Sequence, residues 1–399
     1  MRRFLLARFA DCFARSLVTA MLSYHVFVAT ESYAALGLLG LVEFLPLIPV
    51  ALLGGLFADR FDRRALLIVS TAAALLGAAT LACLGWQRPD DVPWLFAVAL
   101  LLSATTGFSS PPSSSLLPNL VPREIFQNAA VVSSGVIQFA FISGPITMGF
   151  MVGPLGFGAP YALAAGFYAF AILCLATLRT PRKEGPRTPV RWSAVREGIS
   201  FVRHNQPILG SMGLDMLAVI FAGATALLPV YAEEILQVGP EGYGLLRASI
   251  AVGTFSMALV LMTARPFPHP GRALLVAVGI FGLATIVFGL SRSLPLSMLA
   301  FVIAGMADQV SMTTRTVILQ LSTPDDLRGR VSAVNLIFIG ASNELGDAES
   351  GFLASLTSAT FSVVAGGLAC LGVLSWVTLR MPELRDYRPE AASGDAAPR

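Results

Sequence analysis

The chain carries twelve apolar stretches, each long enough to cross the hydrocarbon core of a membrane. Such a helix needs about 20 mostly apolar residues, because the bilayer core holds no water to satisfy backbone polar groups. Hydrophobic residues make up 55% of the chain and charged residues only 13%, well below the share typical of a soluble domain. These features exclude a soluble globular protein and predict an all-helical, polytopic membrane protein. The predicted spans are 9–29, 36–58, 65–85, 94–117, 129–151, 160–179, 208–231, 243–263, 273–290, 295–319, 331–355 and 361–379.

Basic residues collect on one side of this arrangement. If both termini lie in the cytoplasm, 22 of the 27 Lys and Arg residues fall in cytoplasmic segments, and only Arg88 and Arg292 fall in outer loops. Basic short loops mark the cytoplasmic face of a membrane protein. We therefore expect twelve spans with both termini cytoplasmic. The near balance of 27 basic and 24 acidic residues gives no support to nucleic-acid binding.

The longest connection between spans, at 180–207, divides the chain into two halves. It is rich in proline and basic residues, and Trp192, Val195, Ile199 and Val202 recur in it at helical spacing. This pattern fits either a short helix on the inner leaflet or a solvated basic linker. We expect four regions, namely an N-terminal six-helix bundle (1–180), a cytoplasmic linker (181–207), a C-terminal six-helix bundle (208–380) and a cytoplasmic tail (381–399).

The two halves resemble each other in sequence. LLPNLVPREIF at 116–126 and ILQLSTPDDLR at 318–328 align at an offset of 202, and each is a helix end followed by a Pro-acid turn. A parallel duplication of a six-helix unit is an architecture of transporters. The sequence therefore predicts two pseudosymmetric bundles.

The segment between the second and third spans reads GGLFADRFDRRALL. It resembles the cytoplasmic loop motif of the major facilitator superfamily, G-x-L-x-D-R-x-G-R-R, with Asp62 in place of the second glycine. Segments after the fourth span and at 328–351 look like the subfamily of enterobactin-type exporters and transmembrane secretion effectors. The residues assigned to this gating motif are Gly54, Gly55, Asp59, Arg60, Arg63 and Arg64.

The resemblance covers essentially the whole chain and implies both fold and function. It implies two six-helix bundles around a central cavity that opens alternately to either face of the bacterial cytoplasmic membrane. It also implies proton-coupled export of a small amphipathic compound, such as a drug or a siderophore-like metabolite. We expect a monomer in the lipid bilayer that uses protons as its coupling ion and needs no cofactor.

The gating motif has a physical rationale of its own. Gly54 and Gly55 allow close helix approach, and Asp59 is placed to face the positive N-terminal end of a cytoplasmic helix near Val331. In the superfamily this contact ties the two halves together on the cytoplasmic side. The alternative is that the arginines serve only as positive-inside anchors.

The fifth span carries a second motif, in GVIQFAFISGPITMG. It partly matches the Gly-Pro motif typical of superfamily antiporters. A Gly-Pro pair bends a helix, and the glycines permit tight packing. The residues of this motif are Gly135, Gly144, Pro145 and Gly149.

Ionisable side chains inside the spans are candidate functional groups, because burying a charge in the bilayer costs at least ~2.5 kcal/mol. Asp308 lies near the middle of the tenth span, where a carboxylate could carry a proton or contact substrate. Each such acid could instead be held in a structural hydrogen bond. The candidates for proton coupling or substrate contact are Asp308, Glu344, Asp347, Glu43 and Asp215.

Opposite charges within the spans suggest a charge pair. Asp11 and Arg15 are four residues apart on the first span, so they share one helix face. Asp215 lies at a similar depth in the seventh span and could exchange partners with Arg15 or Arg315 as a cavity opens and closes.

No enzyme signature is present in the sequence. It has no Gly-rich nucleotide loop of the P-loop type, and its three isolated histidines suit neither a metal site nor a catalytic triad. Two alternatives to export stay open at this stage. One is a proton-coupled importer of a small nutrient, and the other is a membrane sensor that does not transport.

Overall fold

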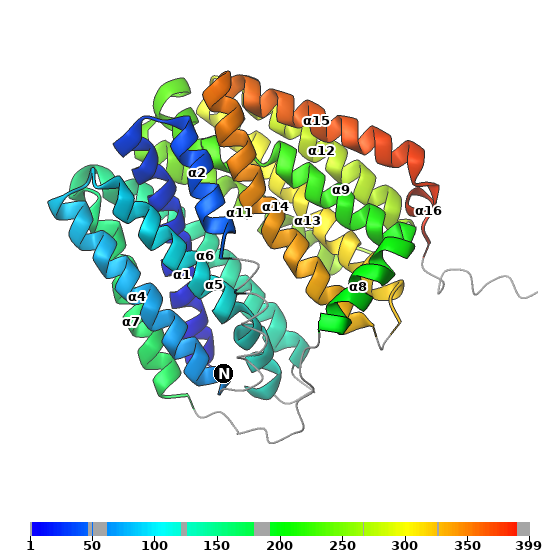
Figure 1. Ribbon diagram of the computed structural model, residues 1–399, viewed down its shortest axis with the longest axis horizontal. Helices are drawn as coiled ribbons and strands as arrows, with labels where there is room; N and C mark the ends of the chain where they lie inside the picture. Colours follow the sequence, from blue (N-terminus) through cyan, green and yellow to red (C-terminus); the bar gives the residue numbers. More distant parts are fainter. Residues whose placement is uncertain are drawn as a thin grey trace, which may run out of the picture. The chain divides into compact units, whose positions relative to one another are not determined.

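The computed structural model describes residues 2–46, 50, 62–120, 126–178, 192–265, 267–324 and 327–388. Within them, helices joined by turns and short loops make up the fold, and there is no β-strand (Figure 1). A helix lies at every predicted span. The long helices are α1 (Arg2–Thr30), α2 (Tyr33–Phe44), α4 (Arg63–Gln87), α5 (Val92–Leu120), α6 (Phe126–Leu155), α7 (Gly158–Ala176), α9 (Gln206–Ala222), α11 (Gly239–Thr263), α12 (Pro270–Leu290), α13 (Leu294–Leu321), α14 (Arg328–Leu356) and α15 (Ala359–Arg380).

Ten helices among the described residues are long and apolar enough to cross a membrane. Of the other two helices, α2 is apolar but only 12 residues long, and α14 carries charged residues along its length. The predicted all-helical membrane fold is therefore confirmed. The count of twelve spans stays a prediction, because the second predicted span continues into residues outside the described ranges.

Polar side chains cap several helix starts, where backbone N–H groups have no partner within the helix. Asp62, Asn205 and Ser358 each accept a hydrogen bond from a backbone N–H in the first turn of α4, α9 and α15. Such caps stabilise a helix by about 1 kcal/mol. They set where the chain changes from loop to membrane-spanning helix.

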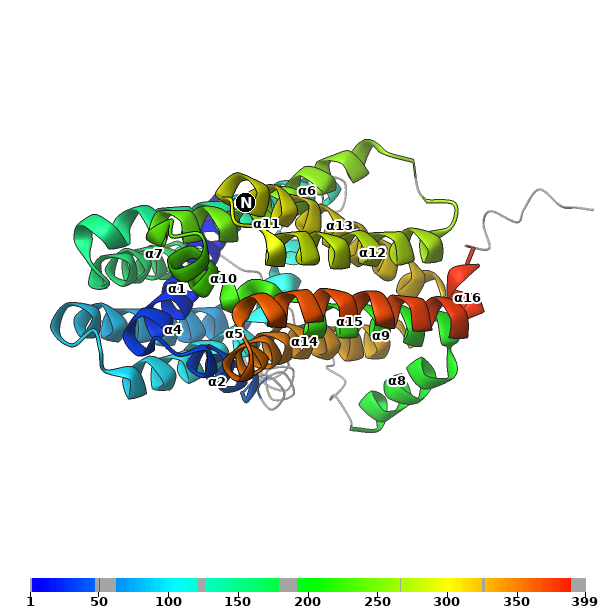
Figure 2. The same cartoon turned by 90° about the horizontal axis from the view of Figure 1, so that it is seen from above.

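The chain forms two compact units. Unit 1 comprises Met1–Val190 and Ala226–Ala251, and unit 2 comprises Arg191–Thr225 and Val252–Arg399. In unit 1 the contacting helices follow the order α5, α4, α7, α1, α6, and in unit 2 they follow the order α13, α12, α15, α9, α14. Figure 2 shows α9 beneath α15 in the second series. Corresponding helices of the two sequence halves therefore have corresponding neighbours, which confirms the predicted repeat.

The seventh span is broken near its middle. Helix α9 ends at Ala222, a 3-10 turn η2 (Ala224–Leu227) follows, and the chain continues through α10 (Leu228–Val230) and a π-helical turn η3 (Tyr231–Ile235). The boundary between the two compact units falls inside η2. Non-helical backbone at membrane depth is tolerated where protein satisfies its polar groups. Here Ser350 of α14 donates to the carbonyl of Gly223, at 3.3 Å.

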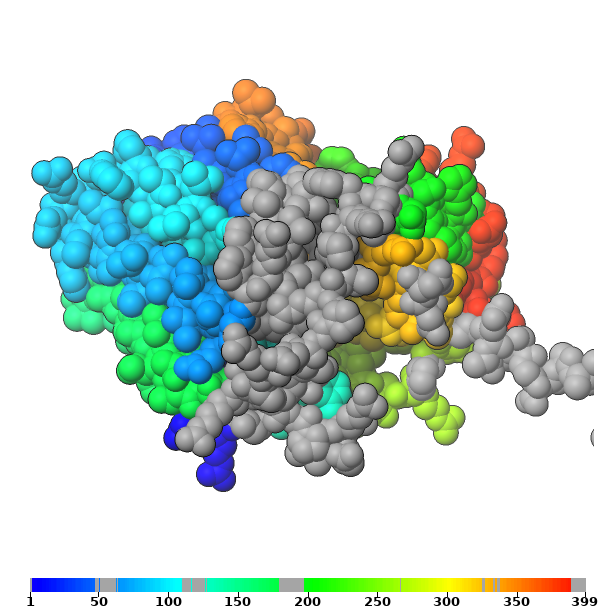
Figure 3. Space-filling model, turned by 60° about the horizontal axis from the view of Figure 1, so that its bottom comes forward, coloured from blue at the N-terminus to red at the C-terminus, as the bar shows by residue number. Residues whose placement is uncertain are grey.

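The linker forms helix α8 (Trp192–His204), which is part of unit 2 and packs against α9 and α14. Val202 is buried in a cluster with Ile208, Met212 and Val331, and Glu197 forms an ion pair with Arg330. Figure 3 shows α8 in green beside the gold segment where α13 ends and α14 begins. A helix is thus present at 192–204 and protein covers part of its apolar face, whereas its contact with the inner leaflet stays a prediction.

Candidate functional site

A buried ion pair joins the centre of α9 to α13 in unit 2. Arg315 Nη1 lies 2.6 Å from Asp215 Oδ2, and only 5% and 8% of the two side chains are exposed. Ser311, one turn from Arg315, donates a 2.9 Å hydrogen bond to Oδ1 of the same carboxylate. Three polar groups on two packed helices therefore form one connected cluster at membrane depth.

Asp308 belongs to the same helix face of α13. It lies three residues before Ser311 and seven before Arg315, and it interacts electrostatically with both Asp215 and Arg315. Arg315 Nε is buried and has no hydrogen-bond partner among the described residues. The guanidinium thus retains an unused donor next to two carboxylates. Such a group of charges can bind an anionic ligand or exchange a proton between its acids.

Unit 1 holds a second charge pair. Arg15 Nη2 lies 3.0 Å from Asp11 Oδ2 on the same helix, and it donates a 3.2 Å hydrogen bond to the hydroxyl of Ser109 on α5. About a quarter of each charged side chain is exposed. The predicted Asp11–Arg15 contact is present, and Asp215 has Arg315 as its partner.

The other acidic candidates lie on α2 and α14. Asp347 accepts a 2.7 Å hydrogen bond from Thr225, which lies in the η2 turn. Glu344 is half-buried one turn earlier on α14. Glu43 is half-buried at the end of α2, where its backbone carbonyl accepts a hydrogen bond from Ser103 of α5. Asp347 therefore fastens α14 to the broken part of the seventh span.

The structure describes only the end of the gating motif. Gly54, Gly55, Asp59 and Arg60 lie outside the described residues, as does the side chain of Arg63. The guanidinium of Arg64 donates to the carbonyls of Leu175, at 2.8 Å, and Ala176 at the last turn of α7. Cations at a helix C-terminus satisfy its free carbonyls and its dipole.

Asp62 departs from the family motif for a physical reason. Its carboxylate accepts a 2.8 Å hydrogen bond from the backbone N–H of Arg64. Glycine at this position could not provide that oxygen. The substitution therefore supplies α4 with an N-cap.

The glycines of the fifth-span motif lie at close helix contacts, with one exception. A Cβ at Gly144 would lie 2.9 Å from the backbone nitrogen of Leu17 on α1, and one at Gly149 would lie 2.5 Å from the carbonyl oxygen of Pro240 on α11. The carbonyl oxygen of Pro145 would lie 2.5 Å from a Cβ at Gly244. Gly135 has nothing within 4 Å of its Cβ position. Helix α6 thus packs tightly on α1 and α11 without help from Gly135.

A group of contacts at the Thr30 end of α1 was not predicted from the sequence. Tyr24 donates a 2.5 Å hydrogen bond to Glu233 of η3, and Tyr33 donates one to Glu234. Tyr243 of α11 donates a 2.9 Å hydrogen bond to the carbonyl of Ala20. The only sequence feature that could have indicated these contacts is the pair of adjacent acids, Glu233 and Glu234, at the end of the seventh span. The π-helical turn that aims them at two tyrosines left no mark in the hydropathy pattern.

Comparison with known proteins identifies the family. The model of the Major Facilitator Superfamily matches residues 4–346. The chain is 26% identical over its whole length to the enterobactin exporter EntS of Citrobacter koseri, of which it covers 95%. It is 25% identical to EntS of Escherichia coli O1:K1, with 99% of this chain and 95% of that protein aligned.

Solved structures share the fold. A POT family transporter in complex with a thioalcohol-conjugated peptide superposes with a TM-score of 0.76 at 14% identity, over 96% of both chains. A bacterial homologue of the human lysosomal transporter Spinster gives a TM-score of 0.71 at 16% identity, with 96% of this chain and 97% of that chain covered. These likenesses support the arrangement of helices and carry no information on substrate.

Proposed function

Because the chain belongs to the major facilitator superfamily, we propose that this transporter exports a small amphipathic compound in exchange for protons. The observation that carries the proposal is the buried cluster of Asp215, Arg315 and Asp308 in α9 and α13. The names of its full-length relatives support export and a siderophore-like substrate. A drug-like cation is the alternative substrate within the same function.

Asp308 is the coupling acid in this proposal. A proton taken up from outside neutralises it and removes its attraction to the Arg315 guanidinium, whose free Nε then has only Asp215 nearby. Return to the cytoplasmic side releases the proton and restores the original charge balance. Glu344, Asp347 and Glu43 remain further proposed contacts for protons or substrate.

The conformational cycle uses the two sequence halves, proposed as bundles 1–180 and 208–380 joined by the linker 181–207 and followed by the tail 381–399. With both termini in the cytoplasm, Tyr24–Glu233 and Tyr33–Glu234 lie toward the outer face and must separate when the transporter opens outward. Gly54, Gly55, Asp59 and Arg60 close the cytoplasmic face in the same cycle.

The test measures accumulation of the fluorescent cation ethidium in efflux-deficient bacteria that express the chain. Wild type lowers ethidium, and a protonophore abolishes the difference. Asp308→Asn and Asp59→Asn raise ethidium to the level of cells without the transporter. Asp90→Asn, an exposed acid in the loop between α4 and α5, is the matched control and behaves as wild type.

Other outcomes favour other functions. An importer would raise intracellular ethidium, and the protonophore would then lower it. A sensor would change no flux in any strain. If ethidium does not respond, the same strains are assayed for retained enterobactin. The proposal is contradicted if the chain exports neither ethidium nor enterobactin.

A further inference from the structure

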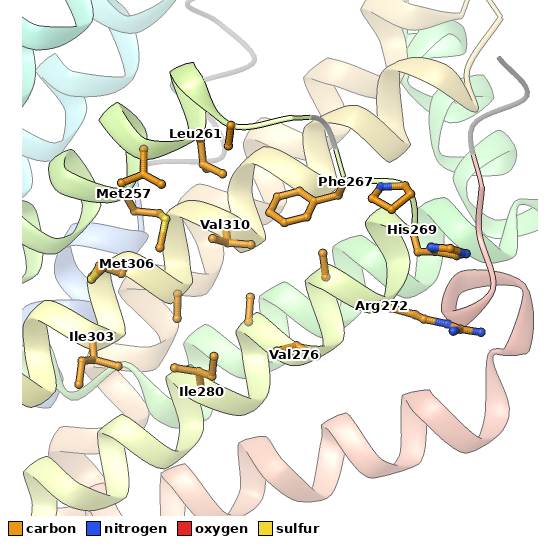
Figure 4. Close-up of a pocket in the computed structure, with 16 residues that line it drawn as sticks. Met257, Leu261, Phe267, His269, Arg272, Val276, Ile280, Ile303, Met306 and Val310 are labelled. Atoms are coloured by element: carbon orange, nitrogen blue, oxygen red, sulfur yellow. The ribbon is translucent and has the colours of Figure 1, made fainter. Parts of the chain in front are cut away.

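An apolar pocket of about 810 Å³ lies between α11, α12 and α13 in unit 2. This volume is within the range of small-ligand sites, about 300–1,000 Å³. Figure 4 shows Ile280, Ile303 and Met306 at one end, and Phe267, His269 and Arg272 at the other. The pocket is a groove with an apolar body and a basic end.

The body of the groove lies on membrane-spanning helices. Val276 is 62% exposed and Val260 is 52% exposed, although both are apolar lining residues. Side chains of this kind at membrane depth face hydrocarbon rather than water. The available occupant of such a groove is a lipid acyl chain.

The basic end is built from the loop that joins α11 to α12. His269 Nε2 is buried and has no hydrogen-bond partner among the described residues. His269 is also the N-cap residue of α12, and its side chain makes no cap bond. Arg265 and Arg272 flank this point, one on each side.

Asp386 offsets part of this positive charge. Its carboxylate accepts a 2.8 Å hydrogen bond from Arg272 Nη2. The guanidinium has five N–H donors, so others remain for a second anion. The unpartnered histidine nitrogen and the two exposed arginines together favour a phosphate group.

We propose that this groove binds an anionic phospholipid of the leaflet on the arginine-rich side, with an acyl chain along Val276 and Ile280 and the phosphate at His269 and Arg272. Basic pockets between transmembrane helices on the cytoplasmic side bind anionic head groups. The site occupies the position where the second half would carry a copy of the gating motif. Residues 264–272 read ARPFPHPGR instead of that motif. In this proposal the loop therefore binds lipid and has no gating role.

The test is a titration of the purified full-length chain in detergent, read by native mass spectrometry. Phosphatidylglycerol and phosphatidylcholine with identical acyl chains are compared, and inorganic phosphate is the free-anion probe. We expect phosphatidylglycerol to bind at least about tenfold more tightly than phosphatidylcholine. Both lipids carry the phosphate, but Arg265 and Arg272 repel the choline cation of phosphatidylcholine. Inorganic phosphate alone should neither bind measurably nor raise the thermal midpoint.

Two variants probe the two ends. His269→Ala removes the unpartnered donor, and Val276→Trp fills the groove. Each should weaken phosphatidylglycerol binding about tenfold. Leu283→Trp is the matched control, because Leu283 lies two turns further on the same face of α12, is 55% exposed and does not line the groove. Asp386→Asn frees Arg272 and should bind the lipid as tightly as wild type or more tightly.

The thermal midpoint without lipid separates loss of the site from loss of the fold. Unchanged midpoints together with weaker binding in His269→Ala and Val276→Trp support the proposal. Equal affinity for the two lipids, or wild-type binding by Val276→Trp, would overturn it. Equal stabilisation by inorganic phosphate would overturn the lipid as occupant.

Discussion

Replacing Asp215 with alanine should destabilise unit 2 more than any change at an exposed acid. The substitution leaves the Arg315 guanidinium, whose side chain is only 5% exposed, without its counter-ion in the interior of α9 and α13. Breaking a buried ion pair in this way costs about 3–5 kcal/mol of unfolding free energy. The Ser311 hydroxyl loses its acceptor at the same time, which adds to the cost.

The double variant Asp215→Leu with Arg315→Met separates pairing from burial. It removes both charges and retains apolar volume, so its stability should lie near that of wild type or above it. Asp215→Leu and Arg315→Met, each made singly, complete the cycle. With single costs of about 3–5 kcal/mol each and a double cost near zero, the coupling energy is the double cost minus both single costs. It should be about 6–10 kcal/mol in magnitude.

The assay is equilibrium unfolding in mixed micelles with a rising fraction of denaturing detergent, followed by intrinsic fluorescence. Asp90→Asn, exposed between α4 and α5, is the control for loss of an acid and should change stability by no more than about 0.5 kcal/mol. Additive single effects, or an Asp215→Ala cost below about 1 kcal/mol, would refute the reasoning that the pair is coupled in a dry interior.

Three further predictions concern the helix contacts and the tail. Gly149→Ala should cost about 1–3 kcal/mol in unfolding free energy, because its Cβ would meet the Pro240 carbonyl oxygen at 2.5 Å. Gly135→Ala, with open space around it, should be neutral or slightly stabilising. Equal effects of the two substitutions would contradict this packing. Arg64→Gln should lower the unfolding free energy by about 1–2 kcal/mol and speed amide hydrogen exchange in the last turn of α7. The reason is that the carbonyls of Leu175 and Ala176 lose charged donors. Unchanged exchange in that turn would argue against this cap. Hydrogen bonds from Arg385 and Arg272 lower the pKa of Asp386 to about 2, below the ordinary value of about 3.9, so its contribution to tail docking is complete above about pH 4 and is lost as pH falls through about 2. Hydrogen exchange of residues 382–388 measures this loss against Asp386→Asn, and protection that stays constant down to pH 2 would contradict it.

Helix positions were predictable because the bilayer makes hydropathy nearly sufficient. Each predicted span contains a described helix, and the starts at Asp62, Asn205 and Ser358 carry the capping residues that loops of this kind require. The break after Ala222 was not predicted. A 3-10 turn in an apolar run leaves the hydropathy unchanged, and its polar satisfaction comes from Ser350, far along the chain.

The charged groups were predictable as a set, but most of their pairings were not. Asp11 and Arg15 pair locally, four residues apart, so sequence spacing identifies them. Asp215 had two candidate partners, and only the packing of α9 against α13 selects Arg315. Glu233 and Glu234 were not predicted as candidates, because a charge at the end of a span carries little insertion cost and so does not indicate a functional group.

The most direct test of proton-coupled export uses the purified chain in proteoliposomes, with ethidium as substrate and an imposed pH gradient as the only energy source. Wild type should accumulate ethidium on the acidic side, against its concentration gradient. Asp308→Asn should lose this accumulation and still exchange labelled for unlabelled ethidium without a gradient, because a neutral side chain can take part in binding but cannot carry a proton. Accumulation by Asp308→Asn at the wild-type rate would contradict the account.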